Sequence, residues 1–145
     1  KVSNKNVTTE FDSDLITQIK ELDGKVDNDM DHLEIGKALD KIFDLLRRSN
    51  KYIDETTPWA LAKDENEKNK LETVIYNLLE SIRVSAVELE PFMPKTSENI
   101  LKQLNTSNKA TTYQGDNSYA TTTPVPLFQR IDKVKKLEEI ENSLK

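Results

Sequence analysis

Apolar residues recur every three to four positions through most of this chain, and this spacing constrains its fold more than any other feature. Such spacing places the apolar side chains on one face of an α-helix, which must then be buried against other elements. The sequence therefore predicts an amphipathic helix between residues 11 and 33. Its apolar face comprises Phe11, Leu15, Ile19, Leu22, Val26, Met30 and Leu33.

Four further series follow, and prolines separate several of them. The series before Pro58 ends at Thr57, because a residue before proline disfavours the helical backbone conformation. Pro58 can open a short turn that carries Trp59, and Pro91 and Pro94 end the longest series. The series are Ile35, Leu39, Ile42, Leu46, Ser49 and Ile53; Leu71, Ile75, Leu78, Ile82, Ser85 and Leu89; Ser97, Ile100, Leu101 and Leu104; and Ile131, Val134, Leu137, Ile140 and Leu144.

These series predict an all-α fold, an antiparallel helix bundle. With three Gly and five Pro in 145 residues, a β-sandwich with many tight turns is excluded. We expect a loose lead-in over 1–10, the bundle over 11–105, an extended polar arm over 106–129 and a last helix over 130–145. Leu127 and Phe128 would anchor the arm, and the last helix would return over the bundle. Because the chain begins at Lys1 and ends within a charged helical pattern, we expect a fragment of a longer protein.

The residue inventory excludes several kinds of chemistry. The chain has no Cys and one His, His32, so it can form neither a disulfide, a Cys-ligated zinc site nor a multi-His metal site. Residues 27–31 start like a calcium loop, but His32 stands where the loop needs Gly and Ala38 where it needs its closing Glu. Residues 94–98 resemble a helix start more than an ATP-binding loop. We therefore expect no catalytic residue, no metal and no cofactor.

Residues 47–59 are the best candidates for a binding surface. The chain carries a net charge of −5, which disfavours a dedicated nucleic-acid protein, yet Arg47, Arg48 and Lys51 follow one another with no intervening acid. The only Trp, Trp59, lies at a corner between two long helices, where it could pack in the core or serve as a platform for single-stranded RNA bases. Asn50 falls on the apolar series, so it could join a buried hydrogen-bond network or contact a ligand.

The 50–64 run, Asn-Lys-Tyr-Ile-Asp-Glu-Thr-Thr-Pro-Trp-Ala-Leu-Ala-Lys-Asp, closely resembles bacterial methionyl-tRNA synthetase. It is similar to the segment of the helical anticodon-binding domain that ends in a Pro-Trp corner. Residues 71–80, 89–97 and 126–132 resemble the next helix, its proline-bounded exit, and the arm and final helix. The resemblance extends from about Phe11 to the end of the chain.

The resemblance implies a role in translation. Synthetases of this family activate methionine with ATP and magnesium and transfer it to tRNA(Met) in the cytoplasm, and the helical domain holds the anticodon loop. It implies that Trp59 stacks on the first anticodon base. From their charge and their position before Trp59, and not from the resemblance, we take Arg47, Arg48, Lys51 and Asn50 as further candidate RNA-binding residues. The family's nucleotide-binding fold, a partner expected in cis, has no counterpart in this sequence. Neither has the first helix of its anticodon domain, whose Asn and Arg read base edges.

Two rival functions remain open. A helical protein–protein interaction module would place Trp59 in the core and use the last helix for docking. An enzyme in its own right is disfavoured, because no nucleophile, base and orienting group can be assembled and no Gly-rich phosphate loop occurs. No apolar run is long enough to span a membrane, so we expect no membrane partner.

Overall fold

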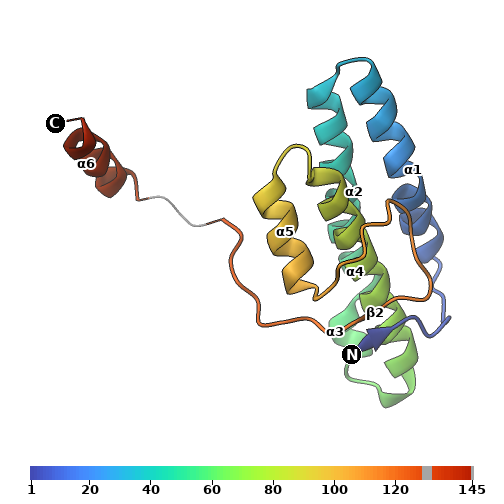
Figure 1. The fold of residues 1–145 in the computed structure, drawn as a ribbon. Helices are drawn as coiled ribbons and strands as arrows, with labels where there is room; N and C mark the ends of the chain where they lie inside the picture. Colours follow the sequence, from blue (N-terminus) through green and yellow to red (C-terminus); the bar gives the residue numbers. More distant parts are fainter. Residues whose placement is uncertain (129–131, 145) are drawn as a thin grey trace.

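The computed structural model describes residues 1–128 and 132–144. Within this part the chain is mostly helical, so the predicted all-α fold class is confirmed. Figure 1 shows α1, α2 and α4 packed lengthwise, with α5 beside α4. A 3₁₀ turn, η1, spans Glu65–Glu67. The helices are α1 Asp12–Asp31, α2 Ile35–Thr56, α3 Pro58–Leu61, α4 Lys68–Leu89, α5 Pro94–Gln103 and α6 Lys133–Ser143; strands β1 Val2–Ser3 and β2 Ser118–Tyr119 pair antiparallel.

The first apolar series is buried as expected. Leu15, Ile19, Leu22 and Val26 line the core face of α1 and meet the apolar residues of α2 and α4. The series ends earlier than predicted, because α1 stops at Asp31 and Leu33 adopts a left-handed backbone with φ 58°. Leu33 is consequently 85% exposed at the α1–α2 connection.

The core face of α2 agrees with the predicted one at Ile42 and Ser49 and differs from it elsewhere, mostly by one residue. Its buried members are Ala38, Ile42, Leu45, Ser49, Tyr52 and Thr56. Asn50 is exposed, so the interpretation that it joins a buried network is wrong. Ser49 fills that role instead, since its Oγ lies 2.9 Å from the Leu45 carbonyl oxygen and 2.8 Å from Ser81 Oγ, within hydrogen-bond distance of both. The sequence pattern missed this register because it gave no weight to Tyr52.

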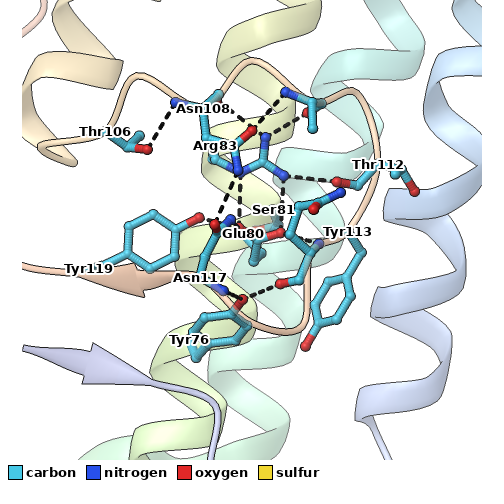
Figure 2. A network of polar contacts seen from close by, with 12 residues as sticks. Tyr76, Glu80, Ser81, Arg83, Thr106, Asn108, Thr112, Tyr113, Asn117 and Tyr119 are labelled. Atoms are coloured by element: carbon cyan, nitrogen blue, oxygen red, sulfur yellow. Dashed lines mark hydrogen bonds and ion pairs between the residues drawn. The ribbon is translucent and has the colours of Figure 1, made fainter.

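Helix α4 is buried on two sides, one of which is polar. Arg83 and Glu80 are fully buried and form an ion pair. The arm covers them: the Arg83 guanidinium donates to the carbonyl oxygens of Ala110 at 2.5 Å and Thr112 at 2.8 Å, and Tyr119 donates to Glu80 (Figure 2). The first part of the arm, over 106–119, is therefore packed on the bundle.

The next part of the arm is tied to the end of α5, because Gln103 Nε2 donates to the Val125 carbonyl oxygen at 2.8 Å and the Thr122 N–H donates to the Gln103 carbonyl oxygen at 3.0 Å. The end of the arm and α6 are exposed. Leu127 is 38% and Phe128 69% exposed, and every described residue of α6 is exposed. Figure 1 shows α6 standing apart from the other helices. The expectations that Phe128 is buried and that the last helix returns over the bundle are therefore wrong, whereas Leu127 is partly covered and lines a cavity with Leu46 and Ile82. Ile131 and the predicted helix start at 130 fall outside the described residues.

Within the described residues, no helix combines the length and the apolar character needed to cross a membrane. Residues 27–31 form the last turn of α1 and not a loop. His32 is exposed, and its Nδ1 lies 2.7 Å from the Asn28 carbonyl oxygen.

Glu88 on α4 makes the stability of the bundle depend on pH. It is 7% exposed, and burial, followed by the neighbouring Asp23 and Asp27 carboxylates, raises its pKa to about 8. The ordinary value is 4.5. Between these two pKa values the unfolded chain releases the proton that the folded chain keeps. The contribution of Glu88 to the free energy of unfolding is therefore fully present below the ordinary pKa and is lost as the pH rises to the pKa of the folded state.

We expect Glu88→Gln to raise the free energy of unfolding by about 1–3 kcal/mol at pH 8, since each pKa unit corresponds to ~1.4 kcal/mol. At pH 4 the variant and the wild type should agree, because both side chains are then neutral. Urea unfolding at the two pH values measures this difference. The exposed Glu98→Gln variant is the control, and an equal response of both variants would contradict the prediction.

Candidate nucleic-acid interface

A sharp corner over 56–61 joins α2 to the rest of the bundle. Thr57 ends α2 in the left-handed region, with φ 44° and ψ 61°, and then starts α3. A β-branched residue rarely adopts this conformation, so surrounding contacts must hold it. Pro58 fixes the next φ as the first residue of α3. The corner lies at the end of the bundle opposite to the α1–α2 connection (Figure 1).

Trp59 projects from this corner into solvent. The residue is 56% exposed, and α3 buries none of its four residues. Core packing of Trp59, which the sequence left open, is therefore wrong, and the expected exposure of its indole is confirmed. An exposed indole on a proline-fixed backbone has the geometry of a stacking platform, because a flat ring can be covered by a base without rearranging the core.

The expected basic patch is largely neutralised by carboxylates. Arg48 is paired with both Asp14 and Glu55, the latter at 3.0 Å, and its side chain is only 11% exposed. Burial opposes its charged form, but the hydrogen bonds to Asp14 and Glu55 outweigh burial and raise the pKa of Arg48. The bond from Arg48 likewise lowers the pKa of Asp14. Arg48 thus ties α1 to the end of α2.

Arg47 and Lys51 are the more accessible cations on this helix. Arg47 pairs with Asp44 at 2.5 Å and Lys51 with Glu55 at 3.7 Å, and both basic side chains are exposed. Exposed pairs of this kind contribute about 0–1 kcal/mol, so a phosphate can compete with the carboxylate. Asn50 lies between these two residues in the sequence. Its side chain is exposed and can contact a ligand.

Sequence reasoning missed the polar support behind the corner. Tyr52 is fully buried, and its hydroxyl donates to Asp12 Oδ1 at 2.6 Å. The helical spacing could have identified Tyr52 as a core residue, because it lies three residues after Ser49 and four before Thr56. A surrounding pocket of about 400 Å³ is lined by residues of the lead-in and the corner, among them Thr9, Glu55, Thr57 and Leu61.

Among the described residues, no group of three or more His, Asp or Glu side chains is arranged to hold a metal ion. The corner itself presents one exposed ring, Trp59, and the exposed cations Arg47 and Lys51 lie upstream on α2.

Comparison with known proteins decides the family. The family model described as the anticodon binding domain of methionyl tRNA ligase matches residues 2–138. The chain belongs to this family. The resemblance seen in residues 50–64 thus extends over most of the chain, and the all-α bundle is the fold of a methionyl-tRNA ligase anticodon-binding domain.

The relatives agree in sequence and in structure. The methionine–tRNA ligase of Clostridium acetobutylicum is 48% identical over 141 residues, which cover 94% of this chain and 22% of the relative. That of Clostridium tetani is 48% identical over 142 residues, covering 93% and 22%. The Mycobacterium tuberculosis methionyl-tRNA synthetase in complex with methionyl-adenylate superimposes with a TM-score of 0.81 at 26% identity, covering 89% of this chain and 27% of that one. The chain thus spans about a fifth of the curated relatives' length.

Proposed function

We propose that this domain holds the anticodon loop of tRNA(Met), with Trp59 as the stacking platform for a loop base, on behalf of a methionine–tRNA ligase. One observation carries the proposal: in a chain of this family, the single Trp is exposed on a corner whose backbone is fixed by Pro58. Stacking of a base on an aromatic ring contributes about 1–3 kcal/mol. The aminoacylation itself, with methionine, ATP and magnesium in the cytoplasm, belongs to the longer ligase.

The cations divide into two roles in this proposal. Arg47 and Lys51 meet the phosphates of the loop, because both basic side chains are exposed and their ion pairs are exchangeable: Asp44 is exposed, and Glu55 lies 3.7 Å from Lys51 and is also paired with Arg48. Asn50 offers its amide beside them. Arg48 holds α1 and α2 together and supports the surface without touching the RNA, since its guanidinium is already occupied by two carboxylates. The rival protein–protein module required Trp59 in the core and loses its main argument.

Trp59 fluorescence tests this function directly, because the chain has no other Trp. We expect an RNA hairpin carrying the tRNA(Met) anticodon loop to quench it, with weak affinity. Two phosphate contacts predict a shallow fall of log affinity against log salt, with a slope of about 1.4, since each single-strand contact contributes ~0.7. The net charge of −5 repels the RNA phosphates at long range and so, like the small number of contacts, keeps the affinity weak.

Arg47→Gln and Lys51→Gln should each lower that slope by about 0.7. Arg48→Gln should leave the slope unchanged and lower the unfolding temperature, which separates the two roles. A hairpin of the same stem with a loop lacking the methionine anticodon measures the non-specific background. Absence of quenching at low salt, or a slope several times steeper, would contradict the proposal.

A further inference from the structure

The hydroxyl of Tyr52 is a meeting point of three helices directly behind the corner. Tyr52 lies on α2 and is fully buried. Its hydroxyl donates to Asp12 Oδ1 of α1 at 2.6 Å and accepts from Asn77 Nδ2 of α4 at 3.3 Å. One oxygen atom thus fixes the last turns of α2 against both of the long helices beside it.

The partners of Tyr52 are themselves held in place. Asp12 accepts from the Thr9 backbone N–H at 2.8 Å and from Thr9 Oγ1 at 2.6 Å. Asn77 Oδ1 accepts from the Tyr113 hydroxyl at 2.9 Å, which brings in the arm. Burial, followed by the hydrogen bond to Asp12, raises the pKa of Tyr52, so the phenol remains a protonated donor. This hydrogen-bond network fixes the orientation of the Tyr52 side chain.

A series of hydrogen bonds to backbone carbonyl oxygens connects Tyr52 to the turn that carries Trp59. Thr56 Oγ1 donates to the Tyr52 carbonyl oxygen at 2.7 Å, and the Thr57 backbone N–H donates to the Ile53 carbonyl oxygen at 3.0 Å. The carbonyl oxygen of Thr57 then accepts from the Ala60 N–H at 2.8 Å. Helix α3 is held by its contact with α4 and by Leu61, which packs against the core, but none of its residues is fully buried, so the end of α2 also contributes to the orientation of the indole.

We propose that Tyr52 is a positioning residue for RNA binding: its hydroxyl fixes the last turn of α2 and thereby sets the orientation in which Trp59 meets a base. The inference rests on the proposed function of Trp59. A Tyr52 that only stabilised the fold would lower the unfolding temperature and leave the mobility of the indole unchanged. A positioning Tyr52 changes that mobility and the affinity for RNA.

Tyr52→Phe removes the hydroxyl and keeps the ring. Tyr119→Phe is the matched control, because Tyr119 is equally buried and also donates to a carboxylate, Glu80, but lies in the arm. We expect both variants to unfold at lower temperature. Only Tyr52→Phe should speed the fluorescence anisotropy decay of Trp59 and weaken binding of the tRNA(Met) anticodon hairpin, by about 3- to 10-fold.

A double-variant cycle tests whether Tyr52 acts through Trp59. In the Trp59→Ala background, Tyr52→Phe should cause no further loss of affinity for the hairpin. The same loss in both backgrounds, or a wild-type anisotropy decay in Tyr52→Phe, would overturn the inference. If Trp59→Ala alone leaves hairpin binding unchanged, the proposed function fails, and the anisotropy decay still decides whether Tyr52 orients the indole.

Discussion

Arg83→Met is expected to lower the free energy of unfolding by about 3–5 kcal/mol, a large part of the 5–15 kcal/mol typical of a domain. The substitution keeps much of the side-chain length but leaves the Glu80 carboxylate buried without its counter-ion. Burial works against ionisation of Glu80, but the bonds from Arg83, Tyr119, Gln114 and Asn117 outweigh it and lower its pKa. The bond from Arg83 is the largest of these, so its removal leaves a buried carboxylate that is costly to keep ionised and that loses its bonding geometry when protonated.

The loss should extend to the arm, because Arg83 also donates to backbone carbonyl oxygens there. The carbonyl oxygens of Ala110 and Thr112 would each lose the guanidinium donor that Figure 2 shows, and the 106–119 segment would detach first. Hydrogen exchange of the arm amides and urea unfolding of the whole chain measure the two effects. Tyr119, which reports on the closed arm, should then become accessible to solvent.

Two controls separate this cause from a general loss of charge. Lys102→Met removes the cation of an exposed pair with Glu98 on α5 and should change stability by less than about 1 kcal/mol. Glu80→Gln combined with Arg83→Met removes the unpaired charge and should recover part of the stability lost in the single variant. A single-variant loss as small as that of Lys102→Met would contradict the buried-pair interpretation.

The helical fold could be predicted from sequence because it depends on short-range spacing. The 3.6-residue period identified α1 and its buried Leu15, Ile19, Leu22 and Val26 without any knowledge of partners. The same rule failed by one residue on α2, where apolar residues lie on both flanks of the core face and Tyr52 turns inward because Asp12 and Asn77 accept and donate at its hydroxyl. Hydrophobicity alone does not register a polar group whose partners come from other helices.

The sequence also failed to predict the contacts between segments that are far apart in the chain. Glu80 and Arg83, three residues apart, have the pattern of an ordinary solvated pair, and residues 106–119 have the composition of a tether. Together they form a buried unit, because carbonyl oxygens of the arm satisfy the guanidinium. At the candidate site, the Pro-Trp corner was predictable from local backbone rules. The pairing of Arg48 with Asp14, 34 residues away, was not predictable, because it depends on the packing of α1 against α2.

Trp59→Ala is expected to lower the kcat/KM of tRNA(Met) aminoacylation by about 10- to 100-fold in a methionine–tRNA ligase that carries this domain. The reason is the loss of a stacking contact of about 1–3 kcal/mol, with ~1.4 kcal/mol corresponding to a factor of ten. Methionine activation measured without tRNA should be nearly unchanged, because the corner lies in a helical domain with no catalytic residue assigned to it. Pyrophosphate exchange and aminoacylation assays on one preparation measure both quantities.

Trp59→Phe should keep more aminoacylation activity than Trp59→Ala, because a smaller ring still stacks on a base. Both variants should keep the helix content and unfolding temperature of the wild type within a few degrees, since the Trp59 side chain is exposed and the core cluster is formed by other residues. Stacking tolerates every base, so the hairpin affinity lost in Trp59→Ala should be similar in size for hairpins that differ in the base that meets the ring. Unfolding of the domain by Trp59→Ala, or an equal fall in methionine activation, would show that the residue acts on structure and would remove the RNA role.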